Sequence, residues 1–326
     1  MSFARQFASK VTSGQTILRR YSSNAATKYL VTPQEANELV QHQGAVLLDA
    51  TWFMPNSPRD PVKEFAEKRL PQARFFNLDK VATPSDKGLM HMMPTGRVFA
   101  DACEKYGISP NTPVVIYDAH GVFSSPRGLF TFRSFNHENS SILDGGLPRW
   151  EAEGLPVETS EPTTPTAVDY PTPELNAKAI TSYEQMLSKF TGKDSAEELI
   201  LDARPKNRFL GIDPEPRPGL RSGHMPGAVS LTFALFLQKN TVNGKEFTTF
   251  LPPDKLRQAL IDAVGEERAQ LIIDGKLPVT TTCGSGMTAA ILWLGLRQLG
   301  VKDISLYDES WMGYGARESS PVVTSD

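Results

Sequence analysis

The chain has 326 residues, enough for two ordinary domains, and its 40% hydrophobic and 9% aromatic content allows each of them a buried core. Its formal net charge of −3 excludes the positive field typical of nucleic-acid or anionic-membrane binding, and no apolar run reaches the roughly 18 residues of a membrane span. Two cysteines, Cys103 and Cys283, are too few for a disulfide framework and indicate a reducing compartment. We therefore expect a soluble protein that works on small molecules or proteins, with no nucleic-acid or membrane partner.

Residues 1–27 differ in composition from the rest of the chain. They are basic and rich in Ser, Thr and Ala, and no acidic residue occurs before Glu35. This composition is typical of a mitochondrial transit peptide, and the stretch RRYSS predicts cleavage after Tyr21. The alternative is a basic tail without a targeting role. We expect the mitochondrial matrix as the main location, with a cytoplasmic pool left open.

The remaining chain contains the same succession of motifs twice. PVVIYD at residues 113–118 corresponds to PVTTTC at 278–283, and further pairs of motifs, among them AVLLDATW and LILDARP, follow in unchanged order. Both halves alternate short strand-like runs with helical stretches, a pattern that favours α/β units around a mainly parallel sheet. We therefore predict an α/β protein of two tandem domains, each a mainly parallel sheet flanked by helices. The expected domains are residues 28–160 and 179–326, joined by a Pro- and Thr-rich linker at 161–178.

The stretch CGSGM at 283–287 connects a predicted strand to a predicted helix that begins near Thr288. Gly284 and Gly286 give the backbone the freedom to turn successive N–H groups towards the Cys283 sulfur, and the N-terminus of the helix adds a positive end. A thiol in this setting is expected to ionise and to act as a nucleophile. The alternative is a small buried hydrophobe, because free cysteine is commonly buried.

Other patterns indicate packing rather than chemistry. Apolar residues recur at helical spacing after the loop, which predicts a helix with one core-facing stripe: Ala289, Leu292, Trp293, Leu296 and Leu299. Cys103 lies in another predicted helix, without a comparable loop, and we expect it in the core. His224, in SGHMPGA, corresponds in the repeat to Arg69, so we interpret it as a residue that fixes its own loop by hydrogen bonding.

Together, several motifs resemble those of the rhodanese-like sulfurtransferases with two tandem domains, the family of rhodanese and 3-mercaptopyruvate sulfurtransferase. The resemblance covers nearly all of the chain after residue 28 and rests on the loop CGSGMT and on LLDATWFMP, FFNLD, VVIYD, SSPR, RFLGIDPEPR, SGHMPGA and LYDESW. It implies that Cys283 carries a persulfide during turnover. It also implies that Gly284, Gly286, Met287 and Thr288 line the substrate site, with Met287 in place of the usual valine. The first half has no cysteine in the corresponding stretch YDAHGVFSSPRG, so we expect it to be catalytically silent.

The composition of the loop discriminates among relatives. Phosphatases of this fold have a longer loop with an arginine six residues after the cysteine, a position that is Ala289 here. Rhodanese itself has basic loop side chains that hold thiosulfate, whereas this loop offers neutral Gly284 and Ser285. A singly charged donor with a carbonyl group fits better. We therefore expect 3-mercaptopyruvate as the substrate, with thiosulfate as the alternative.

A carboxylate substrate requires a cation, and the planar guanidinium group is the best suited. Arg208 and Arg217 lie nine residues apart in a Pro- and Gly-rich stretch. By resemblance, they hold the carboxylate and the carbonyl of the substrate; the plainer interpretation is that of two solvated surface charges. Many relatives have a third arginine at the position that is Leu210 here.

Loss of sulfur from 3-mercaptopyruvate leaves an enolate that must be protonated, so a proton donor is needed. Ser285, two residues after the cysteine, is the nearest candidate. The resemblance implies a relay of Ser285, His91 and Asp79, with His91 reaching across from the first half. One residue more separates Asp79 from His91 than we expect from relatives, and structural roles for both are the alternative.

The few histidines show no metal-ligand spacing, and no dinucleotide- or phosphate-binding glycine motif occurs, so we expect neither a metal nor a cofactor. The resemblance implies thioredoxin, another thiol or cyanide as the sulfur acceptor. Two other functions stay open at this point. One is a thiosulfate sulfurtransferase, and the other is a sulfur-relay module that passes its persulfide to a docked protein in tRNA thiolation or cluster assembly.

Overall fold

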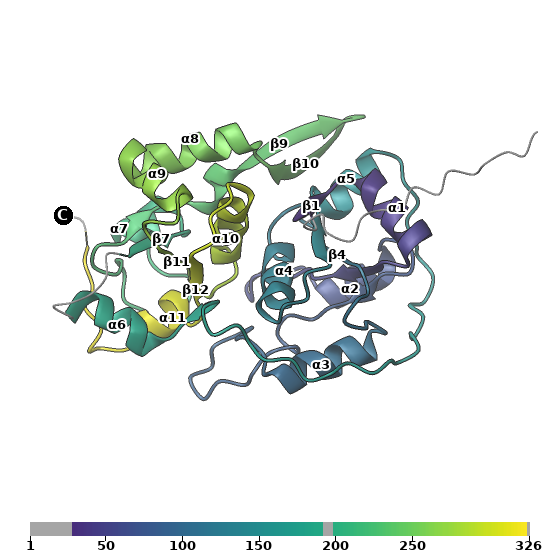
Figure 1. Ribbon diagram of the computed structural model, residues 1–326, viewed down its shortest axis with the longest axis horizontal. Helices are drawn as coiled ribbons and strands as arrows, with labels where there is room; N and C mark the ends of the chain where they lie inside the picture. Colours follow the sequence, from purple (N-terminus) through teal and green to yellow (C-terminus); the bar gives the residue numbers. More distant parts are fainter. Residues whose placement is uncertain (1–27, 192–197, 325–326) are drawn as a thin grey trace, which may run out of the picture.

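The computed structural model describes residues 28–191 and 198–324, which form two α/β domains side by side (Figure 1). The expected transit peptide, residues 1–27, lies outside the described residues. The elements of the first domain are β1 (Leu30–Val31), α1 (Pro33–Gln43), β2 (Val46–Asp49), α2 (Pro61–Glu67), β3 (Arg74–Phe75), α3 (Gly96–Lys105), β4 (Val114–Tyr117), α4 (Ser125–Ser134), β5 (Ser140–Leu143) and α5 (Gly146–Ala152). Strands β2 and β4 are buried along their whole length, as expected for parallel strands covered on both faces.

The second domain repeats this succession with insertions. Its elements are β6 (Ile180–Thr181), α6 (Tyr183–Thr191), β7 (Leu199–Asp202), α7 (Lys206–Leu210), β8 (Val229–Ser230), the 3₁₀ helix η1 (Phe233–Phe236), β9 (Leu237–Val242), β10 (Lys245–Phe250), α8 (Pro253–Val264), α9 (Glu266–Ile273), β11 (Val279–Thr282), α10 (Ala289–Gln298), β12 (Ile304–Tyr307) and α11 (Ser310–Gly315). The strand before the CGSGM loop and the helix after it therefore lie where the sequence predicts them.

Both domains have a five-stranded sheet with the same strand order. The first sheet has the order β1-β5-β4-β2-β3 and the second β6-β12-β11-β7-β8, and all neighbouring strands in both are parallel. Setting aside the β9–β10 insertion, the two orders are identical when strands are counted along each half. This equality confirms the prediction of two tandem α/β domains with mainly parallel sheets.

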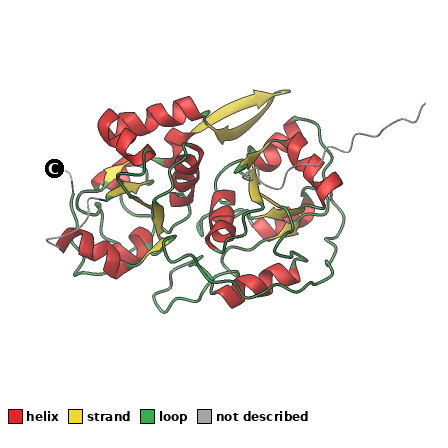
Figure 2. Cartoon of the chain, viewed as in Figure 1, coloured by secondary structure: helices red, strands yellow, loops and turns green. Residues whose placement is uncertain are grey.

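The hairpin β9–β10 has no counterpart in the first sheet, and the sequence did not predict it. Figure 2 shows it as a pair of yellow strands that reaches towards the first domain. Its turn residues Asn243 and Gly244 both have positive φ (52° and 75°), as the tight turns of two-residue hairpins require. Asn243 Nδ2 donates to the Ala152 carbonyl at 3.0 Å, and Phe250 N–H donates to Asp144 Oδ1 at 2.9 Å. The hairpin therefore binds to the first domain next to α5 through these two hydrogen bonds.

The two domains share a hydrophobic core where α4 packs against α10. Phe130 of α4 and Trp293 of α10 meet edge to face, with ring centroids 5.2 Å apart. Every residue from Ala289 to Leu296 is buried. Four of the predicted core-facing residues, Ala289, Leu292, Trp293 and Leu296, are thus buried. The residues between them are buried as well, because the first domain covers the face that would otherwise meet water.

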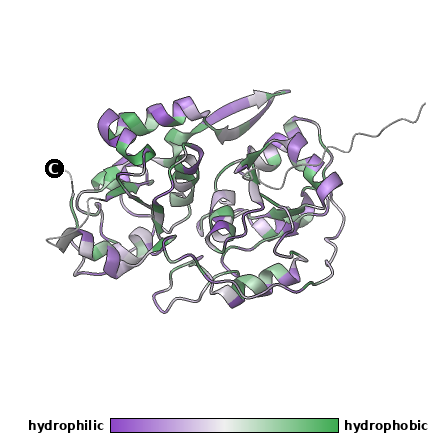
Figure 3. Ribbon diagram, viewed as in Figure 1, coloured by the Kyte–Doolittle hydropathy of each residue, from purple (hydrophilic) through white to green (hydrophobic). Residues whose placement is uncertain are grey.

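The distribution of hydropathy follows this arrangement. Apolar residues gather on the central strands of both sheets, whereas the hairpin and the outer helices carry many hydrophilic residues (Figure 3). Among the helices that the structure describes, none combines the length and the hydropathy needed to cross a membrane.

Candidate active site

Cys283 directly follows β11, the middle strand of the second sheet. It therefore lies at the carboxyl end of parallel strands, where open α/β sheets bind their ligands. Gly286 has a φ of +83°, a conformation that favours glycine, and its N–H donates to Cys283 Sγ at 3.1 Å. Of the amides expected to surround the sulfur, this is the one in hydrogen-bond contact with it among the described residues.

Residues at the start of α11 form hydrogen bonds with the backbone of the CGSGM loop. The Ser310 hydroxyl accepts a hydrogen bond from Cys283 N–H at 3.2 Å, with Ser310 itself at a φ of +49°. The N–H groups of Trp311 and Met312 donate to the carbonyls of Cys283 and Gly284, both at 2.9 Å. These contacts satisfy buried backbone groups of the loop and fix its path. Ser310 lies in the motif LYDESW but was not among the predicted site residues.

Cys283 lines a cavity of about 240 Å³. Its own exposure is 2%, so a substrate reaches the sulfur through this cavity. The first domain contributes Trp52, Met54 and Phe123. The second domain contributes Arg204, Pro205, Arg208, Glu215, Pro216, Arg217, Leu220, Phe233, Gly284, Ser285, Met287, Thr288 and Met312. Of the four loop residues that the resemblance assigns to substrate binding, Gly284, Met287 and Thr288 line the cavity, whereas Gly286 does not line it and donates its N–H to the sulfur instead.

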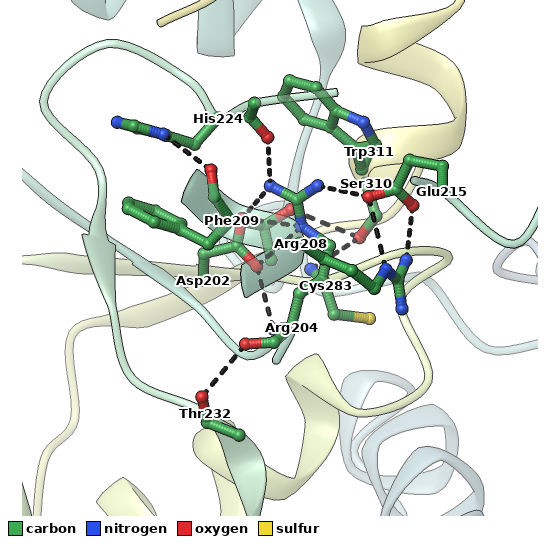
Figure 4. A network of polar contacts seen from close by, with 12 residues as sticks. Asp202, Arg204, Arg208, Phe209, Glu215, His224, Thr232, Cys283, Ser310 and Trp311 are labelled. Atoms are coloured by element: carbon green, nitrogen blue, oxygen red, sulfur yellow. Dashed lines mark hydrogen bonds and ion pairs between the residues drawn. The ribbon is translucent and has the colours of Figure 1, made fainter. Parts of the chain in front are cut away.

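The predicted pair Arg208 and Arg217 lines the same cavity as the sulfur. Arg208 is ion-paired with Glu215, and Glu215 also binds buried Arg204 at 2.8 Å (Figure 4). Arg217 Nη2 contacts Met90 Sδ of the first domain at 3.4 Å. Burial lowers the pKa of Arg217, and the positive charge of Arg208 lowers it further. A bound anion would relieve this repulsion, so the pair is suited to a carboxylate.

Glu215 belongs to a buried charged network that sequence reasoning missed. The side chains of Asp202, Arg204 and Glu215 are between 1% and 2% exposed. Arg204 Nη2 donates to Asp202 Oδ2 at 2.7 Å and to the Gly223 carbonyl at 2.8 Å. The network anchors Arg208 to the end of β7. Its signal in the sequence is the pair of motifs LILDARP and GIDPEPR, whose acids had no assigned partner.

Asp79, His91 and Ser285 lie in one hydrogen-bonded row that crosses the domain interface. His91 Nδ1 is 3.1 Å from Asp79 Oδ1, and His91 Nε2 is 3.0 Å from Ser285 Oγ. Trp52 Nε1 donates to Asp79 Oδ2 at 2.9 Å, and the Trp52 ring packs edge-on against the imidazole. The structure therefore brings all three proposed relay residues together, and Trp52 orients the carboxylate.

The surroundings of His91 favour a neutral imidazole. Burial lowers the pKa of His91, and the hydrogen bond to Asp79 opposes this effect only in part. Burial raises the pKa of the Asp79 carboxyl, but the hydrogen bond and charge of His91 outweigh it and hold this pKa below its ordinary value. An ionised Asp79 only accepts, so Nδ1 carries the hydrogen and Nε2 accepts from the Ser285 hydroxyl. A protonated Nε2 instead donates to the Ser285 carbonyl, 2.8 Å away.

The residues assigned to packing occupy structural positions. His224 Nδ1 is 2.8 Å from the Phe209 carbonyl, and its ring stacks on Phe209, as expected for a residue that fixes its loop. Cys103 is 1% exposed within α3, and burial raises the pKa of its thiol. In the described part of the chain, no group of three or more His, Cys, Asp or Glu side chains is arranged to hold a metal ion.

Fold and site together define a two-domain α/β protein with a single thiol site at the domain interface. Residues 32–153 and 183–317 both match the sequence profile of the rhodanese-like domain. The chain belongs to the rhodanese-like family.

Individual relatives match over most of their length. The chain is 40% identical over 285 residues to a probable 3-mercaptopyruvate sulfurtransferase of Schizosaccharomyces pombe, covering 86% of this chain and 91% of the relative. It is 34% identical over 296 residues to the mitochondrial thiosulfate/3-mercaptopyruvate sulfurtransferase 1 of Arabidopsis thaliana, covering 85% and 73%. The crystal structure of the Tum1 protein of Saccharomyces cerevisiae is similar, with a TM-score of 0.77, 28% identity and coverage of 91% and 97%.

Proposed function

We propose that this chain is a 3-mercaptopyruvate sulfurtransferase that works through a persulfide on Cys283. The observation that supports this most directly is the shared cavity, in which the sulfur, a loop without charged side chains and the pair Arg208 and Arg217 lie together. The chain is an enzyme of the sulfurtransferase class, and several of its relatives are named 3-mercaptopyruvate sulfurtransferases, which supports the same choice of substrate. The two arginines hold the substrate's carboxylate and carbonyl and direct its sulfur towards Cys283.

The first half-reaction transfers one sulfur atom. The Cys283 thiolate attacks the sulfur of 3-mercaptopyruvate, an S–S bond forms, the C–S bond breaks, and the bonding pair leaves with carbon as the enolate of pyruvate. One proton taken up at that carbon gives pyruvate, and the enzyme keeps the persulfide Cys283–S–SH. Ser285 supplies this proton; neutral His91 then takes a proton from solvent at Nε2, forms an imidazolium that Asp79 stabilises, and passes the proton to Ser285 Oγ.

The second half-reaction returns the enzyme to its starting state. An acceptor thiolate, from thioredoxin or another thiol, or cyanide attacks the outer sulfur. The S–S bond of the persulfide breaks, and the electron pair restores the Cys283 thiolate. A role as a sulfur relay to a docked protein would use the same persulfide with a different acceptor.

Thiosulfate is the second candidate donor, and the two arginines that favour a carboxylate would also attract this anion. The relative from Arabidopsis carries both donors in its name. Steady-state pyruvate release from 3-mercaptopyruvate, compared with thiocyanate release from thiosulfate and cyanide, tests the choice. We expect a higher kcat/KM for 3-mercaptopyruvate, and a preference for thiosulfate would overturn the proposal.

We also propose mitochondrial delivery by residues 1–27. The support is their composition, together with the mitochondrial designation of one relative. Fusion of residues 1–30 to a fluorescent reporter tests it. The reporter should accumulate in mitochondria, and a cytosolic reporter would contradict this location.

A further inference from the structure

A buried ion pair connects the two domains behind the CGSGM loop, and the chemistry above does not use it. Arg127 lies in the first turn of α4, and Asp308 follows β12 of the other domain. Arg127 Nη2 and Asp308 Oδ1 are 2.6 Å apart, with side-chain exposures of 1% and 7%. The pair therefore crosses the interface out of contact with bulk water.

The same two side chains bind the backbone on both sides of the relay. Arg127 Nη2 donates to the His91 carbonyl at 2.6 Å, and Arg127 Nη1 donates to the Gly286 carbonyl at 3.4 Å. The second oxygen of Asp308 accepts from Met93 N–H at 2.8 Å. A Cβ at Gly286 would lie 2.9 Å from Arg127 Nη1, so glycine here also makes room for the guanidinium. One ion pair thus holds the turn that carries His91 and the loop that carries the sulfur.

His91 needs this support because its backbone is strained. It has a φ of +42°, a conformation that residues with a Cβ rarely adopt and that persists only where the surroundings enforce it. The carbonyl of His91 and the N–H two residues later are the groups bound by Arg127 and Asp308. Release of this turn would let the imidazole swing away from Ser285.

We propose that Arg127, from the catalytically silent domain, is a positioning residue that, paired with Asp308, fixes the strained turn at His91 and keeps the imidazole on Ser285. This inference rests on the proposed 3-mercaptopyruvate activity, because that reaction needs a proton at carbon. It gives the silent domain a defined part in turnover. The active site is complete only when the two domains are docked.

Two variants and one matched control test the proposal. Arg127→Met removes the guanidinium, and the double variant Arg127→Met, Asp308→Asn also removes the carboxylate that the first change leaves buried and unpaired. The control is Arg133→Met on the same helix, because Arg133 is also buried and ion-paired, but its partners, Glu138 and the Ser140 carbonyl, lie within its own domain and away from His91. Thermal unfolding of all three measures folding separately from activity.

We expect kcat for pyruvate release to fall about 100-fold in both Arg127 variants, since misplacement of a catalytic group by about 1 Å costs this much. KM should change less than about threefold, because Arg208 and Arg217 are untouched. Arg133→Met should lower the melting temperature and leave kcat unchanged. A wild-type kcat in the folded Arg127 variants, or an equal loss in Arg133→Met, would overturn the proposal.

The pH dependence of kcat gives a further test, because it would not change in the Arg127 variants if Arg127 had a purely structural role. The charged groups that face His91 are Asp79 from its own domain and Arg127 from α4, and the positive charge of Arg127 lowers the pKa of His91. Its removal should shift the acidic limb of the kcat profile to higher pH. An unshifted limb would contradict the positioning role.

Thiosulfate separates failure of this inference from failure of the proposed function. The Cys283 thiolate attacks the outer sulfur of thiosulfate, the S–S bond of thiosulfate breaks, and sulfite leaves with the bonding pair. This transfer forms the same persulfide but needs no proton at carbon. Intact-mass measurement of persulfide formation from thiosulfate should slow less than about threefold in the Arg127 variants. An equal loss with both donors would overturn the positioning of the relay. A wild-type enzyme that forms the persulfide from thiosulfate but releases no pyruvate from 3-mercaptopyruvate would overturn the proposed function instead.

Discussion

The two cysteines show how the surroundings of a thiol determine its use. Both are buried, at 1% exposure for Cys103 and 2% for Cys283. Cys103 lies in a helix among apolar side chains, and burial raises the pKa of its thiol. Cys283 Sγ accepts from the Gly286 N–H and lines the cavity that Arg208 and Arg217 also line. Burial alone does not distinguish them, whereas the Gly-Ser-Gly pattern in the sequence does.

Replacement of Cys283 by serine should abolish sulfur transfer while leaving the fold intact. Serine is slightly smaller, and its hydroxyl still accepts the Gly286 N–H, but it forms no persulfide. We expect pyruvate release to fall by more than about 1000-fold, with no gain of one sulfur in the intact mass. The matched control is Cys103→Ser, which buries a hydroxyl and should cost about 1 to 2 kcal/mol in unfolding free energy at unchanged kcat. Persistent turnover in Cys283→Ser would refute the nucleophile.

Glu215 is the residue that sequence reasoning missed and on which substrate binding should depend most. It holds Arg208 at the cavity and neutralises buried Arg204. Glu215→Gln keeps an acceptor oxygen but removes the charge, so Arg208 loses its ion pair. We expect KM for 3-mercaptopyruvate to rise about tenfold with a smaller change in kcat, and the unfolding free energy to fall by about 3 kcal/mol. An unchanged KM would show that Arg208 is held by other contacts.

At the scale of elements, the strands and helices of the repeat could be predicted, and family resemblance indicated the contact of His91 with Ser285 across the domains. The hairpin and the packing of α4 on α10 could not be predicted. The strand PVTTT and the helix after Thr288 follow from short-range patterns, and the structure has β11 and α10 there. The β9–β10 hairpin lies between β8 and α8, where the first half has a loop without strands, residues 76–95, so the internal repeat gave no signal for it. Likewise, α10 is buried on all sides from Ala289 to Leu296 because of α4, which begins 164 residues earlier in the sequence (289 − 125).

The contact between the hairpin and Asp144 should make stability depend on pH. Burial raises the pKa of Asp144 to about 6, against the opposing hydrogen bond from Phe250 N–H. The folded protein therefore binds a proton more tightly than the unfolded chain, and this group stabilises the fold as pH falls from about 6 towards its ordinary value of 3.8. Above pH 6 the buried charge is destabilising.

Asp144→Asn tests this dependence because the amide oxygen still accepts from Phe250 N–H without a charge. We expect the variant to be more stable than the wild type by about 1 to 3 kcal/mol at neutral pH. The difference should narrow at pH 5, where the wild-type carboxyl gains its proton. Urea unfolding at both pH values measures it. A difference that does not change with pH would contradict the raised pKa.

At the scale of the whole molecule, the corresponding loops of the two domains begin with different residues. Asp118 follows β4 as Cys283 follows β11, and β4 and β11 occupy the same place in sheets of equal order. The carboxylate of Asp118 is fully buried and accepts from the N–H groups of Phe123, Ser124 and Ser125 at 2.8 to 3.0 Å. The sequence could show that the first loop lacks a cysteine. It could not show that backbone N–H groups surround the Asp118 carboxylate, an arrangement called the cradle below, because their positions depend on the path of the backbone.

The backbone N–H groups around Asp118 in the first domain should therefore bind an external anion once the carboxylate is removed. Asp118→Ala leaves four amides, those of His120, Phe123, Ser124 and Ser125, and the Ser125 hydroxyl without their acceptor, which we expect to cost about 3 kcal/mol or more in unfolding free energy. Formate has the size of the missing group and should restore part of this loss. Because α4 begins at this loop and carries Arg127, kcat should fall and recover together with stability.

Thermal unfolding and pyruvate release in formate, compared with chloride at equal ionic strength, measure this rescue. The matched control is Asp101→Ala, an exposed position on α3 that holds no buried donors. Formate should raise the melting temperature of Asp118→Ala and leave those of the wild type and of Asp101→Ala unchanged. Equal effects of formate on all three proteins would mean that the silent loop requires no anion, because the cradle would then hold its shape without one.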